Sequence, residues 1–152
     1  GINPGNFRVV ASAICFIDAE NPSVEVGTGE VDIGTLALTA GTSPHTTISL
    51  SADFNGFATD VFMTEVTDCI WFYETPDSIE VGAHLLKFVT DGALDTPPDY
   101  GGDESVSIPV PGSGAVELVT GSGTNIKIDV SEKRQYRFIL DERQQQFQVI
   151  AR

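Results

Sequence analysis

Few side chains in this sequence could do chemistry, and most of those are carboxylates. The 152 residues contain 22 acidic side chains but only two histidines, His45 and His84. Neither histidine stands in a His-x-x-x-His pair, and no Gly-x-Ser-x-Gly sequence marks a nucleophilic serine. Because 22 carboxylates can form many pairs, the sequence alone does not exclude the two catalytic acids of a glycosidase. Because no cofactor motif accompanies them, we nevertheless expect a protein that is not an enzyme.

The densest group of acids lies in a Pro- and Gly-rich segment, where Asp95, Asp99 and Asp103 stand between Asp91 and Glu104. Calcium takes roughly six to eight oxygen ligands, and acid-rich loops often supply them. The spacing of an EF-hand is absent. A calcium ion held by Asp95, Asp99 and Asp103 is therefore one expectation, and a solvated acidic loop without any cofactor is the other.

Two cysteines, Cys15 and Cys69, could form one disulfide within the chain. Both lie in apolar, strand-like sequence. Buried free thiols are common in protein cores, and a single bridge is common in secreted domains. The sequence leaves both states open, and it contains neither a Cys-x-x-Cys redox motif nor the spacing of a zinc site.

The net charge of −14 limits the partners. Binding to phosphate groups needs a basic footprint, so the charge excludes nucleic acid and disfavours an anionic membrane surface. The charge is also segregated. Residues 127–152 hold six bases against four acids, whereas residues 1–126 hold two bases against 18 acids. This predicts a solvated C-terminal strand pair or, alternatively, head-to-tail attraction between copies of the chain.

The sequence pattern predicts that these residues lie on strands and on the turns between them. Short runs rich in Val, Ile, Thr and Phe are separated by Gly, Pro, Asn and Asp, which is typical of a sandwich. We expect strands over residues 7–18, 24–27, 30–38, 46–52, 60–65, 70–74, 84–90, 105–110, 115–119, 125–130, 136–141 and 146–151. The last two should form a hairpin, because Tyr136, Phe138 and Leu140 alternate with polar residues, as do Phe147 and Val149.

These patterns predict an all-β, immunoglobulin-like antiparallel β-sandwich. The length is that of a single domain spanning 1–152, with residues 1–40 as extra N-terminal strands. No apolar run reaches the roughly 18 residues of a membrane span. The sequence shows neither an initiating Met nor a signal peptide, so we expect a processed mature protein or a fragment.

A series of motifs in residues 46–151 carries a family resemblance. The turn Asp53-Phe54-Asn55-Gly56-Phe57 precedes the strand of Trp71, and Gly82-Ala-His84-Leu-Leu-Lys87-Phe88-Val-Thr-Asp91-Gly92 follows it. This order resembles the starch- and glycogen-binding β-sandwich modules. The later stretches Tyr100-Gly-Gly, Asn125-Ile-Lys-Ile and Tyr136-Arg-Phe-Ile-Leu-Asp141 resemble modules of the outer-membrane starch-binding lipoproteins of gut bacteria.

The resemblance implies a site for sugar. Such sites stack aromatic rings on sugar rings and fix the hydroxyls with a few polar groups. Lys87 matches the family's ligand-contacting lysine, and Asp91 matches a turn residue. Phe57 replaces one tryptophan of the usual platform, and Ala93 and Leu94 stand where the other is expected. Tyr100, in a Pro- and Gly-rich loop, is a candidate stacking residue, whereas Trp71 is expected in the core. The ligand-binding candidates are therefore Phe57, Lys87, Tyr100 and Asp91.

The function that follows from the resemblance is a non-catalytic carbohydrate-binding module, for an α-glucan such as starch or glycogen, in a secreted or cell-surface protein. The alternative is a self-assembling extracellular subunit of a fibre, pilus or surface layer. The apolar stretch over residues 7–17 and the segregated charge favour that alternative, because an apolar strand can complete a neighbour's sheet by strand addition. A passive spacer domain within a larger enzyme is a third interpretation.

Overall fold

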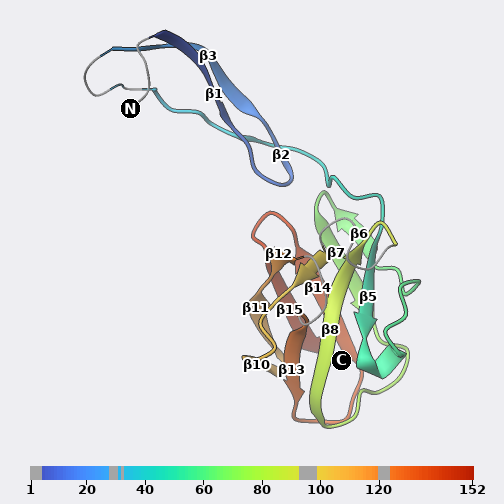
Figure 1. Cartoon of the computed structure of the whole chain (residues 1–152). Coiled ribbons are helices and arrows are strands. Elements are labelled where there is room, and N and C mark those ends of the chain that lie inside the picture. Colours follow the sequence, from blue (N-terminus) through green and yellow to red (C-terminus); the bar gives the residue numbers. More distant parts are fainter. Residues whose placement is uncertain (1–4, 28–30, 32, 93–98, 120–123) are drawn as a thin grey trace. The chain divides into compact units, whose positions relative to one another are not determined.

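A computed structural model describes residues 5–27, 31, 33–92, 99–119 and 124–152 (Figure 1). The chain divides into two compact units, Gly1–Thr42 and Ser43–Arg152. The division falls close to residue 40, where the expected extra N-terminal strands end. Each unit is described by itself below.

The second unit is a β-sandwich of two sheets, so the predicted all-β sandwich fold is confirmed. Its six-stranded sheet contains β5 (Ile48–Ala52), β8 (Gly82–Thr90), β9 (Asp99–Gly101), β10 (Ser107–Val110), β12 (Glu117–Val119) and β13 (Ile126–Val130). Its five-stranded sheet has the order β11 (Gly112–Ala115), β15 (Gln146–Ala151), β14 (Tyr136–Asp141), β7 (Ile70–Glu74) and β6 (Thr64–Thr67). The described strand pairs are antiparallel, except that β10 runs parallel to β13. A short 3₁₀ helix, η1 (Asp53–Asn55), follows β5.

Period-two alternation builds the core between the two sheets. In β14 the side chains of Tyr136, Phe138 and Leu140 are fully buried, while those between them are less so. Ring contacts join the sheets, because Phe88 of β8 lies 6.0 Å from Phe147 of β15 between ring centroids. The predicted C-terminal hairpin is confirmed as the β14–β15 pair. Trp71, predicted in the core, is also buried.

The edge strand β11 can lie close against this core because it contains Gly114. A Cβ atom at that position would collide with the side chains of Ile108 and Phe147. The close approach brings β11 into register with β15, where Ser113 faces Gln148. The glycine therefore lets β11 extend the five-stranded sheet.

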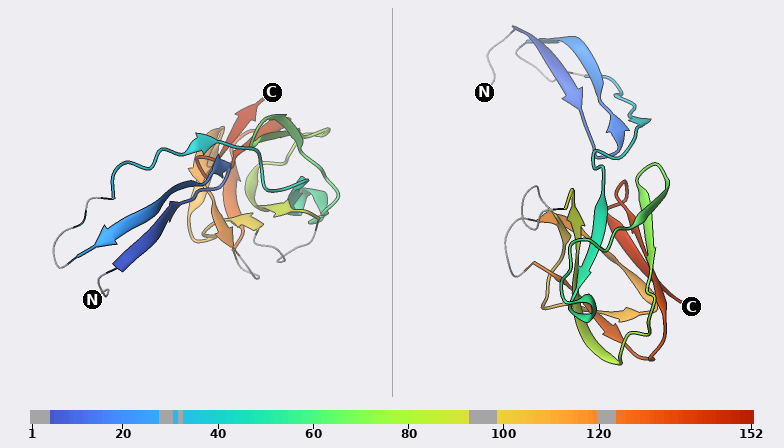
Figure 2. Two further views of the ribbon diagram at one scale, coloured as in Figure 1. Left: turned by 90° about the horizontal axis from the view of Figure 1, so that it is seen from above. Right: turned by 90° about the vertical axis from the view of Figure 1, so that its right-hand side faces the viewer.

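The first unit is built on a hairpin-like pair of strands (Figures 1 and 2). β1 (Gly5–Ala11) pairs antiparallel with β3 (Ala19–Val26), and the short β2 (Phe16–Ile17) pairs with β4 (Thr39–Ala40). The strand expected over residues 30–38 is not present in the part of it that is described, residues 31 and 33–38. Gly34 has a φ of 71°, a left-handed conformation that interrupts an extended strand.

Candidate functional site

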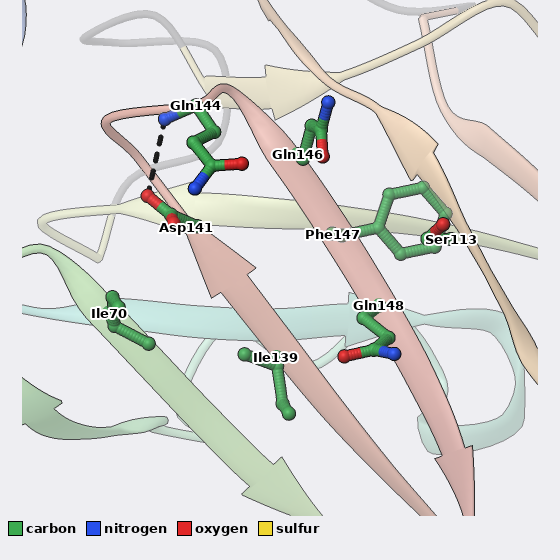
Figure 3. A pocket seen from close by; sticks show the side chains of 8 residues that line it. All are labelled: Ile70, Ser113, Ile139, Asp141, Gln144, Gln146, Phe147 and Gln148. Atoms are coloured by element: carbon green, nitrogen blue, oxygen red, sulfur yellow. Dashed lines mark hydrogen bonds between the residues drawn. The ribbon is translucent and has the colours of Figure 1, made fainter.

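A groove of about 300 Å³ lies on the outer face of the five-stranded sheet (Figure 3). The alternation that sends Phe138 and Leu140 into the core turns Ile139 outward, and it does the same for Gln146 and Gln148 in β15. The described residues that line the groove are Ile70, Ser113, Ile139, Asp141, Gln144, Gln146, Phe147 and Gln148.

The strand register arranges the outward side chains in two rows across the sheet. In the first row Ile139 lies between Phe72 of β7 and Gln148 of β15, and Gln148 lies opposite Ser113 of β11. In the second row Asp141 lies between Ile70 and Gln146. Each row therefore passes from an apolar residue on β7 to an amide on β15.

The turn after β14 fixes the polar end of the groove. The carboxylate of Asp141 accepts the backbone N–H groups of Arg143 at 3.0 Å and of Gln144 at 3.2 Å. Aspartate side chains stabilise turns in this way. Figure 3 shows the Gln144 side chain lying back over Asp141, so its amide is presented at the rim.

The apolar end of the same face continues over Val66, Ile70, Phe72 and Ile139. The guanidinium carbon of Arg137 lies 5.4 Å from the centre of the Phe72 ring, within the range of a cation–π contact. Arg137 also forms an ion pair with Glu74. This end therefore offers hydrocarbon surface next to the Arg137 guanidinium, whose partner Glu74 also forms an ion pair with Arg152.

Two of the four ligand-binding candidates lie at least partly at the surface. The side chain of Phe57 is 42% exposed, directly after the left-handed Gly56. Asp91 binds the segment before β5, because its Oδ1 atom accepts the Thr46 N–H at 2.8 Å, the Thr46 hydroxyl at 2.8 Å and the Thr47 N–H at 3.2 Å. Burial alone would raise the pKa of Asp91, but hydrogen bonds from Thr46, His45 and Thr47 lower it to about 2.

Tyr100 is fully buried, so its ring offers no face to a sugar. The reason is its register in β9, because it lies opposite Phe88 of β8 and both side chains point into the core. Its hydroxyl donates to Oε1 of the buried Glu142 at 3.0 Å. Burial, together with the Glu142 carboxylate, raises the pKa of Tyr100 far above its usual value.

Lys87 faces away from the sandwich core, as its alternation with Phe88 predicts, yet it is only 4% exposed. It lies across from Ser51 of β5, and the next pair on the same face is Val89 with Ser49. Both serine hydroxyls are buried, and neither has a hydrogen-bond partner among the residues that the structure describes. Because Lys87 is buried and Phe57 is exposed, the two side chains do not form a surface platform.

The three calcium candidates fall in different surroundings. Asp95 lies outside the described residues. Asp99 is buried, and its carboxylate accepts the Thr90 N–H at 3.1 Å. Asp103 is exposed and accepts the Ser105 N–H at 2.8 Å. Hydrogen bonds from the Ser105 side chain and from its backbone lower the pKa of the Asp103 carboxyl. Each of the two described carboxylates thus satisfies a backbone N–H group.

Both cysteines, Cys15 and Cys69, are disulfide-bonded, and the chain has no free thiol. Among the described residues, no helix is long and apolar enough to cross a membrane.

The groove contains residues that the sequence reasoning did not single out. One feature of the sequence does indicate this surface: Ile139 is an apolar residue at an outward position of a strand whose other residues alternate between apolar and polar. The comparisons with known proteins do not assign the site. The chain matches no protein-family model, and no curated protein and no solved structure matches it significantly.

Proposed function

We propose that this chain is a non-catalytic carbohydrate-binding module whose ligand lies in the groove on the five-stranded sheet. The observation that carries the proposal is the pairing of an apolar floor, Ile70 and Ile139, with the amides of Gln144, Gln146 and Gln148. A sugar ring has apolar C–H faces and hydroxyls around its edge. Amide side chains both donate and accept hydrogen bonds, so they suit hydroxyl groups.

The charges around the groove favour a neutral glycan. Asp141 is the one carboxylate among its described lining residues, and the chain as a whole carries a net charge of −14. An anionic polysaccharide would meet Asp141 without a basic group among the described residues that line the groove, and Arg137, on the apolar end of the same face, is already ion-paired with Glu74. The family resemblance makes an α-glucan the first ligand to test.

The same lining supports binding without catalysis. Glycoside hydrolysis normally uses two carboxyl groups about 5 to 10 Å apart across the scissile bond. Here Asp141 has no second carboxyl beside it among the described lining residues, and its own carboxylate holds the turn. The disulfide-bonded state of both cysteines supports a secreted or cell-surface location, because such bonds persist in oxidising compartments.

The test is a titration of the intact chain with a soluble maltooligosaccharide, together with pulldowns on insoluble starch, glycogen and cellulose. Binding that falls about tenfold in Gln148→Ala and in Gln146→Ala is expected, since each change removes hydrogen bonds to the sugar. Phe57→Ala is the matched control, since it truncates an exposed side chain outside the groove. No retention on any glycan would overturn the function. Loss of binding in Phe57→Ala alone would indicate that the glycan binds at the turn after η1 instead of in the groove.

A further inference from the structure

We propose that β1 is a self-recognition edge, which pairs antiparallel with β1 of a second copy to form a closed dimer. This inference goes beyond glycan binding. It rests on the first unit alone and uses none of the residues of the groove.

The first observation is that β1 has an unpaired edge. Among the described residues β1 pairs only with β3, so in this part of the chain the sheet has two strands and no further strand pairs with the outer edge of β1. Five of the seven residues of β1 are exposed and none is buried. An isolated two-stranded sheet is marginal in water, and adding strands stabilises it. The strand therefore lacks the neighbours that normally stabilise a sheet.

The two edges of this sheet are not equivalent. Proteins protect an edge with proline and with charged side chains, because both oppose the addition of another strand. β3 carries Pro22 together with the exposed acids Glu20 and Glu25. β1 carries no proline, and its one charged residue is Arg8. The edge of β1 is thus the one that accepts a strand.

The sequence of β1 can pair with itself in a register that sets no two charged side chains against each other. With Val9 on a two-fold axis, Phe7 lies opposite Ala11 of the second copy, and Arg8 lies opposite Val10. Residues that face each other across antiparallel strands share one face of the sheet. This register therefore continues the face of Phe7, Val9 and Ala11 from one copy into the next. Placing the axis on Arg8 instead would set two guanidinium groups against each other.

Such a contact has closed two-fold symmetry, because both copies use the same surface. It yields a four-stranded sheet with the order β3, β1, β1 and β3, and it leaves no β1 edge for a third copy. The product is a dimer and not the filament that the sequence alternative describes. Two linked binding units would also bind a polymeric ligand with added avidity.

The test uses a pair of charge variants in the intact chain. Val10 is 43% exposed and lies opposite Glu20 within the hairpin, so Val10→Lys is compatible with the fold. In the dimer it places a lysine opposite Arg8 of the other copy, twice per dimer. Sedimentation velocity over a range of concentrations should show a dimer for the natural chain. It should show a dimer dissociation constant raised roughly tenfold for Val10→Lys.

The rescue is the double variant Val10→Lys with Arg8→Glu, which makes the opposed charges attractive and should restore the dimer. Within each hairpin Arg8 is ion-paired with Glu20, and the new lysine, which lies directly opposite Glu20, replaces that cation. Ile150→Lys, an equal change of charge on the second unit, is the control and should leave the dimer intact. A natural chain that stays monomeric at every concentration overturns the proposal, as do filaments. A dimer that Val10→Lys does not weaken also overturns it. Titration of the same variants with a short maltooligosaccharide distinguishes failure of the dimer from failure of the proposed function. A monomeric variant should bind this sugar with the affinity of the natural chain.

Discussion

The indole N–H of Trp71 donates to Oε2 of Glu142 at 2.8 Å, and both side chains are buried in the sandwich. The other carboxylate oxygen accepts the Tyr100 hydroxyl, and the Nε2 atom of His45 lies 3.7 Å from it. The two donors come from opposite sheets, β7 and β9. A single carboxylate therefore satisfies polar groups from both halves of the core.

Replacing Glu142 by alanine should lower the free energy of unfolding by about 3 kcal/mol. The change leaves the Trp71 and Tyr100 donors buried without an acceptor, and an unsatisfied buried group costs about 1 to 3 kcal/mol. Glu142→Gln should cost less, since its amide oxygen still accepts one bond. Urea denaturation measures both. Glu117→Ala, at an exposed carboxylate in β12, is the control and should change stability by less than about 0.5 kcal/mol.

Asp91 should make the protein less stable in acid. Its pKa in the folded chain is about 2, below the usual 3.8, so the unfolded chain binds the proton more tightly. The stabilisation is therefore complete above pH 4 and is lost as the pH falls from about 4 to about 2. Because the Asp91 side chain is 34% exposed, solvent screening reduces the contribution to about 1 to 2 kcal/mol.

The measurement for Asp91 is the urea midpoint at pH 6, 4, 3 and 2 for the natural chain and for Asp91→Asn. Asparagine is the matched replacement, because Asp91 has a φ of 50° and asparagine tolerates that left-handed conformation. The variant should be less stable than the natural chain at pH 6. Its stability should fall less steeply between pH 4 and pH 2. Equal slopes in the two proteins would contradict the assignment.

Much of the sandwich could be predicted from the sequence because alternation is a local property. The inward residues of β14 and β15 followed from their period of two, and so did the hairpin that joins them. The outward direction of Lys87 followed in the same way. Its burial did not, because burial depends on what covers that face of the sheet, and no local pattern encodes it.

Tyr100 and Glu142 show where local reasoning fails. Tyr100 stands beside glycines and acids, which are typical of a loop, yet its pairing with β8 turns the ring inward. Glu142 follows Asp141 and precedes Arg143 in a polar turn, so nothing nearby marks it as buried. Its role depends on Trp71 and Tyr100, which lie 71 and 42 residues away in sequence. Such contacts between distant residues are set by the assembled fold.

Ile139→Gln should weaken glycan binding about fivefold while leaving stability within about 0.5 kcal/mol of the natural chain. Ile139 faces outward at the centre of the groove, so the change converts its apolar floor to a polar one without touching the core. Calorimetric titration with a maltooligosaccharide measures the affinity. Ile150→Gln makes the same exchange at an outward residue of β15 that does not line the groove, and it should bind as the natural chain does.

Gly101→Ala should destabilise the sandwich by about 3 kcal/mol or prevent its folding. A Cβ atom at Gly101 would collide with the Thr124 carbonyl oxygen and would lie 2.6 Å from a methyl carbon of Val119. The obstacle is backbone that a side-chain rotation cannot relieve, and overpacking typically costs about 1 to 3 kcal/mol even where neighbours can move. Gly27→Ala is the control, because a Cβ atom there meets nothing within 4 Å. Urea denaturation compares the two. Equal stability of the two variants would contradict this prediction. It would mean that β9 can move away from Thr124 and Val119 at little cost in free energy, and that the position of Tyr100 is less rigid than its hydrogen bond to Glu142 implies.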